Sequence, residues 1–268
     1  MIVASNGSGL GNRIKAIISC LRVSTEAKVY WPQVPGVFSS QFSDLFENNM
    51  EVSNISGRKY DSWRMLVLPT DPIPDGFSIV TADVDRIGRK FSHTNSNGRN
   101  IDLEYSRIPR VVLDDCVEKL GVLKINKKVM QWVNETSKTF TEKTVSVHIR
   151  SWEDQDPDEE SRLRQKHFFN LNNFLEEMYK FDNDTNFFVC SDSENIINKL
   201  KKIFGTRILT YERHSDLETS RSTRVGGQDD LAEMILLSKN KVIIGSYIST
   251  FTEMAWYFGG AKAEVIIC

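Results

Sequence analysis

The second half of the chain alternates short apolar runs with amphipathic segments, and this alternation constrains the fold more than any other feature. Apolar runs of strand length occupy residues 145–150, 187–190, 207–209, 242–244 and 264–267. Segments with helical spacing occupy residues 127–138, 171–181, 194–204, 229–238 and 250–258. Strands that alternate with helices form a parallel sheet covered on both faces. Such sheets bind ligands at the carboxyl ends of their strands.

The first residues of the chain predict a second unit of the same kind. Residues 2–4 are apolar, residues 6–11 are rich in glycine, and residues 12–21 place apolar side chains at helical spacing. We interpret this stretch as a strand-to-helix turn, followed by a strand at residues 28–31. A turn of this type combines backbone amides with a helix N-terminus, an arrangement that binds phosphates and other anions.

Two familiar phosphate-binding loops do not fit this turn. The dinucleotide fingerprint requires G-x-G-x-x-G and an acidic residue at the end of the second strand. Gly7, Gly9 and Gly11 instead give G-x-G-x-G, and the second strand ends in Trp-Pro. The P-loop requires G-K-[ST], whereas here Gly11 is followed by Asn12 and Arg13. The anion that this loop binds therefore belongs to another class of ligand.

The length of 268 residues is compatible with one large α/β domain or with two halves of roughly 130 residues each, because a single core stops growing near this size. We place the boundary near residue 125, which gives an N-terminal α/β domain at residues 1–125 and a C-terminal Rossmann-like domain at residues 126–268. A cleft between the two domains is the expected active site. Residues 83–110 are polar and lack periodicity, so we expect a long irregular segment that lines this cleft.

The bulk composition excludes some classes of partner and some cellular locations. A net charge of -2 gives no electrostatic footprint for nucleic acid, so a small molecule or a neutral polymer is the expected partner. No apolar run approaches the roughly 20 residues of a membrane span, and no signal peptide precedes the first strand. These features predict a cytoplasmic protein. The four scattered cysteines lack metal-ligand spacing and predict buried free thiols.

The strand at residues 145–150 carries the strongest candidates for chemistry. It ends in His148 and Arg150, which project to the same side, and Glu153 and Asp154 follow at once. A guanidinium at this edge can hold a diphosphate by bidentate charge-assisted bonds. The alternative is an ion pair between Arg150 and an aspartate that fastens the loop to the strand.

Two further strand ends supply polar groups to the same edge. Asp192 follows the strand at residues 187–190, where it either caps the next helix or serves the site. Four hydroxyl residues and Glu253 follow the strand at residues 242–244, around a helix start; the hydroxyl residues are Ser246, Ser249, Thr250 and Thr252. Hydroxyls and free amides there form an anion cradle without positive charge.

The evidence for a metal site is weak. Asp83 and Asp85 form a D-x-D pair, but several such pairs arise by chance in a chain with this many aspartates. No cluster of His and Cys ligands supports zinc. Arginine and helix N-termini can stabilise a departing phosphate instead.

Three segments together resemble the conserved blocks of the fucosyltransferase superfamily. They are "SGLGNRIKAI" near the start, "HIRSWED" after a central strand and "IIGSYISTFTEMA" near the end. That superfamily includes protein O-fucosyltransferases, α-1,6-fucosyltransferases and nodulation fucosyltransferases. Their order and spacing match over most of the chain, whereas residues 50–125 carry no recognisable block.

The resemblance implies a GT-B fold with two Rossmann-like domains, and inverting transfer of fucose from GDP-fucose to a glycan or glycoconjugate hydroxyl. It implies no cofactor and no metal. Arg150 falls on the arginine that contacts the β-phosphate of the donor, and the acidic residue of that block falls on Asp154 or Glu153. We therefore expect the catalytic residues to be Arg150, Glu153 and Asp154. The expected donor-binding residues are Gly9, Gly11, Asn12, Arg13, His148, Asp192, Asp230, Ser249, Thr250 and Phe251.

Some points stay open at this stage. Asp230 could read the guanine edge or serve as an acidic helix cap. Ser151 follows Arg150 where the core-fucosylating members have a second arginine, and the absence of a secretory segment favours a bacterial or viral member. The alternatives are a transferase for another nucleotide sugar, an oxidoreductase on a doubly wound sheet, and a non-catalytic nucleotide- or glycan-binding protein of the same fold.

Overall fold

The computed structural model describes residues 3–48, 50–53, 66–67, 71–72, 79–80, 89–91, 108–153, 159–247 and 249–268. Its first unit is a parallel sheet of β1 (Val3–Ser5), β2 (Lys28–Tyr30) and β3 (Val52–Ser53) in that order. Helix α1 (Leu10–Val23) connects the first two strands, and the short α2 (Phe42–Leu45) follows the second. The strand-to-helix turn predicted at the start of the chain is therefore confirmed.

The second unit is a five-stranded parallel sheet with the order β11-β10-β7-β8-β9. Its strands are β7 (Thr144–Ile149), β8 (Asn186–Ser191), β9 (Ile208–Leu209), β10 (Val242–Gly245) and β11 (Glu264–Ile267). The helices between them are α6 (Leu171–Tyr179), α7 (Glu194–Phe204), α8 (Arg224–Leu237) and α9 (Thr250–Phe258). Alternation of strand and helix in the sequence thus predicted the sheet correctly.

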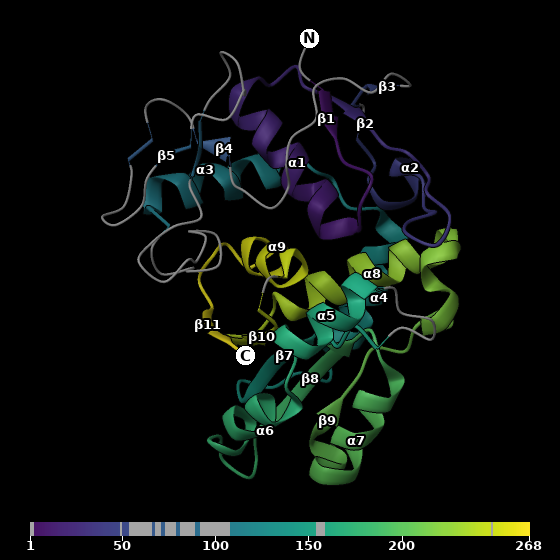
Figure 1. Cartoon of the computed structure of the whole chain (residues 1–268), viewed down its shortest axis with the longest axis vertical. Helices are drawn as coiled ribbons and strands as arrows, with labels where there is room; N and C mark the ends of the chain where they lie inside the picture. Colours follow the sequence, from purple (N-terminus) through teal and green to yellow (C-terminus); the bar gives the residue numbers. More distant parts are fainter. Residues whose placement is uncertain are drawn as a thin grey trace.

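Alternate residues of the central strands enter two different cores. Val145, Val147 and Ile149 of β7 pack with residues of α6 and α7 on one face of the sheet. On the other face, Phe188 and Cys190 of β8 belong to a larger core with α8 and α9. This second core also contains residues of α1, α3 (Arg110–Leu120) and α4 (Lys127–Ser137), so helices fill the space between the two sheets (Figure 1). The division at residue 125 stays a prediction.

Several elements differ from the expectation. Helices α5 (Glu159–Phe168) and α3 lie in segments where no helix was predicted. Helix α8 begins at Arg224 and not at 229, because Thr223 caps it by accepting a hydrogen bond from the Gly226 amide at 3.0 Å.

The segment expected to be irregular, residues 83–110, contains a short strand. β6 (Arg89–Phe91) pairs antiparallel with β4 (Leu66–Val67) and with β5 (Ile79–Val80). The Asp83 and Asp85 pair lies outside the described residues.

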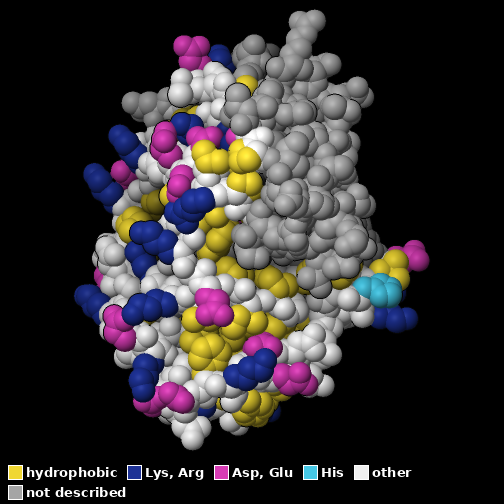
Figure 2. Space-filling view, turned by 90° about the vertical axis from the view of Figure 1, so that its left-hand side faces the viewer, with side chains coloured by type: hydrophobic (Ala, Val, Ile, Leu, Met, Phe, Trp, Pro, Cys, Tyr) yellow, Lys and Arg dark blue, Asp and Glu magenta, His cyan; other side chains and the backbone are white. Residues whose placement is uncertain are grey.

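The described helices and one face of the molecule show how apolar and charged side chains are distributed in the described parts. Within them, no helix combines the length and the apolar character needed to cross a bilayer. On the coloured part of the face in Figure 2, basic and acidic side chains are interspersed, with apolar patches between them. Charge is not concentrated on this face, so the cleft described next is where charged groups meet.

Candidate functional site

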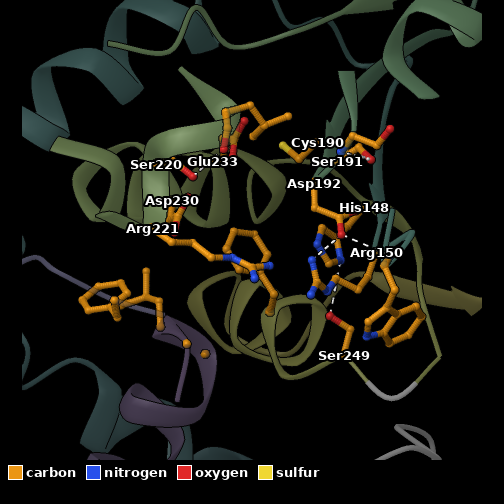
Figure 3. Close-up of a pocket in the computed structure, with 18 of the residues that line it drawn as sticks. His148, Arg150, Cys190, Ser191, Asp192, Ser220, Arg221, Asp230, Glu233 and Ser249 are labelled. Atoms are coloured by element: carbon orange, nitrogen blue, oxygen red, sulfur yellow. Dashed lines mark hydrogen bonds and ion pairs between the residues drawn. The ribbon is translucent and has the colours of Figure 1, made fainter. Parts of the chain in front are cut away.

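A cleft of about 1130 Å³ opens at the carboxyl ends of the second sheet, and both halves of the chain line it. The first half contributes residues 8–12 and 36–38. The second half contributes the ends of β7 and β8, the start of α9 and residues of α8 (Figure 3). The predicted residues that line the cleft are Gly9, Gly11, Asn12, His148, Arg150, Glu153, Asp192, Asp230, Ser249, Thr250 and Phe251.

The glycine-rich loop presents backbone to the cleft. Helix α1 begins at Leu10, and no described side chain caps it at Gly9. A Cβ atom at Gly9 would meet no atom within 4 Å, so the loop is open on that side. A Cβ atom at Gly11 would lie 2.7 Å from the carbonyl carbon and oxygen of Thr250, so only glycine permits α1 to approach α9 this closely. The uncapped helix end is therefore held against the opposite wall and attracts anions.

The start of α9 contacts the glycine-rich loop and α1 from the other half of the chain. Ser249 caps α9 by accepting from the Thr252 amide at 3.3 Å. The Thr250 hydroxyl donates to Asn12 Oδ1 at 2.8 Å, across the two halves of the chain. Deeper in the same contact, Lys15 Nζ pairs with Glu253 Oε2 at 2.8 Å, and both side chains are buried. Together these bonds fix the glycine-rich loop opposite the hydroxyl residues of α9.

His148 and Arg150 lie next to each other at the end of β7, as predicted from strand geometry (Figure 3). His148 is buried, shares a 2.8 Å hydrogen bond with Thr252 Oγ1, and stacks on the Phe251 ring at 4.8 Å. Burial lowers the pKa of His148 to about 4, so the imidazole is neutral at physiological pH. The positive charge at this edge of the sheet therefore comes from Arg150.

Asp192 forms the anchor for the loop after β7. Its carboxylate pairs with the Arg150 guanidinium and accepts hydrogen bonds from the Ser151 amide at 2.7 Å and the Trp152 amide at 3.1 Å. The alternative of an Arg-Asp ion pair is thus present, but with Asp192. Asp192 does not cap α7, because Ser193 takes that place and accepts from the Ile196 amide.

Of the two predicted acidic residues, the structure describes only Glu153. Glu153 lines the cleft, and its Oε2 accepts a 2.6 Å hydrogen bond from the Ser193 hydroxyl. Asp154 lies outside the described residues. The consecutive residues Asp192 and Ser193 therefore hold Arg150 and Glu153 in place from the neighbouring strand.

Sequence reasoning missed an ion cluster on α8. Arg213 donates to Asp230 Oδ1 at 2.8 Å and also pairs with Glu233, and all three line the cleft. Burial raises the pKa of Glu233 to about 7 in spite of the nearby guanidinium. Asp230 lies in the second turn of α8, whose cap is Thr223, so of its two open alternatives the acidic helix cap does not apply. The one available signal was the spacing of Asp230 and Glu233, which places both on one helix face.

Arg13 does not line the cleft. Its side chain is only 2% exposed and packs against the rings of Trp31 and Phe38, which contact each other edge to face. Its Nε donates to the Ser8 carbonyl at 2.6 Å. Burial lowers the pKa of Arg13 to about 10, which leaves it charged at neutral pH. Direct contact with a donor, as predicted for Arg13, is not visible in this arrangement.

Comparisons of sequence give no relative, because no protein-family model and no curated protein sequence matches the chain. Solved structures do match. The α-1,6-fucosyltransferase NodZ soaked with GDP-fucose has a TM-score of 0.53 at 13% identity, covering 96% of this chain and 91% of that chain. The fucosyltransferase NodZ from Bradyrhizobium has a TM-score of 0.52 at 14% identity, covering 95% of this chain and 91% of that chain.

A second kind of fucosyltransferase matches over nearly the whole length. POFUT1 in complex with GDP-fucose has a TM-score of 0.53 at 11% identity, covering 99% of this chain and 97% of that chain. The chain has the GT-B fold. The predicted fold class is therefore confirmed, with two parallel sheets on either side of the cleft.

Residues suited to a metal ion are scarce in the described part. Among the described residues, no group of three or more His, Cys, Asp or Glu side chains could hold an ion. All four cysteines are free. The hydrogen-bond donors that line the cleft include the guanidinium groups of four arginines, hydroxyls and backbone amides, which suit an anionic ligand.

Proposed function

We propose that this chain is an inverting glycosyltransferase that moves fucose from GDP-fucose to a hydroxyl of a glycan or glycoconjugate, without a metal cofactor. The observation that carries the proposal is the convergence of Arg150, the start of α9 and the uncapped start of α1 on one cleft. Structures of the same fold in complex with GDP-fucose support the choice of donor. In this proposal residues 126–268 hold the nucleotide sugar and residues 1–125 form the acceptor side.

The reaction places negative charge on the leaving diphosphate. The acceptor oxygen forms a bond to C1 of fucose while the bond from C1 to the β-phosphate oxygen breaks, and GDP leaves with the electron pair. Arg150 faces this charge, with Asn12, Ser249 and Thr250 sharing it by hydrogen bonds. Asp192 holds the guanidinium at the sheet edge, so it needs little reorganisation during the reaction.

The acceptor hydroxyl must lose its proton as the new bond forms. Glu153 is the base that the geometry supports best, because its carboxylate lines the cleft and Ser193 holds it there. Asp154 is the second candidate for this role. Since His148 is buried and committed to Thr252, we assign it to support of Phe251 and the wall of the nucleotide site.

We assign recognition of guanine to the α8 cluster. The N1 and N2 groups of guanine are hydrogen-bond donors on one edge, and two carboxylates are suitable acceptors. Asp230 and Glu233 both line the cleft, and Arg213 orients both. Uracil presents one donor and two carbonyl acceptors on its edge, so this cluster favours guanine nucleotides.

Turnover tests this proposal. Wild type is incubated with GDP-fucose, GDP-mannose or a uridine diphosphate sugar and a panel of glycans, with and without chelator, and GDP release and product mass are measured. We expect transfer of fucose in the presence of chelator, with a kcat at least about a hundredfold lower for Arg150→Ala. Arg162→Ala removes an exposed arginine of α5 and serves as the matched control.

Two results would contradict the proposal. Equal kcat values for wild type and Arg150→Ala would remove Arg150 from the chemistry. Tight binding of GDP without transfer to any glycan in the panel would favour a non-catalytic nucleotide-binding protein of this fold.

A further inference from the structure

Helix α1 carries three buried cations, and they are not alike. Lys15 pairs with Glu253, and Arg22 pairs with Asp71 at 2.8 Å and with Asp115 at 2.7 Å. Among the described residues, Arg13, in the first turn, has no carboxylate partner, and its two terminal nitrogens donate no hydrogen bond. A buried charge without a counter-charge is costly, so this exception requires an explanation.

The surroundings of Arg13 are not those of a structural ion pair. Its guanidinium carbon lies 4.9 Å from the centre of the Trp31 ring and 4.8 Å from that of Phe38. The aromatic rings hold the plane of the guanidinium, and the bond from Nε to the Ser8 carbonyl holds its edge. The side chain is thus held in one position without an acidic partner among the described residues.

That position is directly behind an anion-binding wall. Ser8 and Phe38, two of the three contacts of Arg13 named above, line the cleft. The uncapped N-terminus of α1 carries partial positive charge, which makes this the least favourable end of the helix for a cation. The unpaired charge and the helix end therefore add to one positive potential on the side of the cleft opposite Arg150.

We propose that Arg13 is a positioning residue for a diphosphate group, acting as a buried, unneutralised cation that both holds the glycine-rich loop and attracts the anion to it. The inference rests on the proposed nucleoside diphosphate donor. Arg13 does not touch the ligand. Its counter-charge arrives with the ligand, and the low-dielectric layer of Trp31 and Phe38 lets its field act with little screening by water.

Inorganic pyrophosphate is the probe that isolates this role from recognition of the base. Its Kd is measured by calorimetry for wild type, Arg13→Gln, Arg13→Met and Arg13→Lys, beside the Kd values of GDP and GMP. We expect the two neutral variants to weaken pyrophosphate and GDP on the order of tenfold, and GMP by less, because it carries one phosphate fewer. We expect Arg13→Lys to retain pyrophosphate binding within about threefold, because it keeps the charge.

Arg22→Gln is the matched control, because it neutralises a buried cation of the same helix that has acidic partners. We expect it to lower the melting temperature while the Kd of pyrophosphate stays within about twofold of the wild-type value. Melting temperatures of all variants are recorded, and Arg13→Met serves where Arg13→Gln does not fold.

Three results would overturn the inference. They are an unchanged Kd for pyrophosphate in both neutral variants, equal losses for GMP and GDP, and a loss in Arg13→Lys as large as in Arg13→Gln. If wild type binds pyrophosphate but no guanine nucleotide, the donor proposal fails, and the pyrophosphate series still decides the role of Arg13. If wild type binds neither, both fail.

Discussion

The two walls of the cleft use different means to meet the same ligand. The wall from the first half, at residues 8–12 and 36–38, contains no charged residue, and Arg13 is buried next to it. The wall from the second half consists of charged side chains, such as Arg150 and Arg213, each held by a carboxylate. The first wall depends on close backbone approach, whereas the second depends on individual side chains and their partners.

This difference predicts how each wall responds to change. A wall made of backbone tolerates a larger side chain where the space beside it is open. It is disrupted when a larger side chain is placed where two segments are in contact. A wall of paired charges fails when one partner is removed, because the other is left buried and unpaired. The buried contact between α1 and α9, which we call the floor, contains Lys15 and Glu253; neither residue lines the cleft, but this ion pair joins the two walls.

The largest effect is expected at this floor. Lys15→Met leaves Glu253 without its ammonium partner in a buried place, and we expect the free energy of unfolding to fall by about 3–5 kcal/mol. The double variant Lys15→Met/Glu253→Met removes both charges and should recover most of that loss. Urea unfolding of the single and the double variant measures the loss and the recovery of the free energy of unfolding.

The control for this pair is an exposed one. Lys241 pairs with Glu142 on the surface, and Lys241→Met should change the free energy of unfolding by less than about 1 kcal/mol. A loss at Lys15 no greater than at Lys241 would show that the floor does not join the walls.

The next effect concerns the backbone wall. Gly11→Ala places a Cβ atom 2.7 Å from the Thr250 backbone, so α1 must move away from α9. We expect the free energy of unfolding to fall by about 1–3 kcal/mol and the affinity for GDP to fall with it. Gly7→Ala is the control, since a Cβ atom there meets nothing within 4 Å, and its effect should stay within about 0.5 kcal/mol. Equal effects at the two glycines would refute the role of close approach.

The smallest effect is a pH dependence of the side-chain wall. Burial lowers the pKa of His148 to about 4, so the folded protein favours neutral imidazole. The stability due to this preference is fully present above pH 6.5 and is lost as the pH falls toward 4. Between pH 7.5 and 5.0 we expect His148 to account for a loss of about 2 kcal/mol.

Urea unfolding of His148→Gln at these two pH values tests this expectation. The variant should lose about 2 kcal/mol less than wild type over the same interval, whereas His167→Gln, an exposed histidine of α5, should behave as wild type does. An unchanged pH dependence in His148→Gln would mean that the imidazole is not held neutral.

The second half of the fold could be predicted from sequence because its strands are buried on both faces and its helices are amphipathic. Helix α5 escaped prediction since its sequence, "EESRLRQKHF", contains few apolar residues and therefore little periodicity. The start of α8 was misplaced because residues 224–228 contain two glycines and a single apolar residue, and only the cap at Thr223 marks the start of the helix.

Prediction of the site succeeded where strand geometry decides and failed where tertiary packing decides. The alternation of side chains along β7 predicted that His148 and Arg150 lie together. The cluster of hydroxyl residues predicted the start of α9. Arg13 was expected beside the ligand, but its aromatic contacts come from residues 31 and 38, which local sequence cannot place. The pairing of Arg213 with Glu233 depends on a loop folding against α8 and had no signal in the sequence.

The measurement that tests the central claim most directly is calorimetric titration of GDP and UDP into wild type and Arg150→Ala, each with and without chelator. The account predicts micromolar binding of GDP that survives the chelator, much weaker binding of UDP, and collapse of GDP binding in the variant. Absence of GDP binding, or binding that requires a divalent ion, would contradict the account of a metal-free site for a guanine nucleotide sugar.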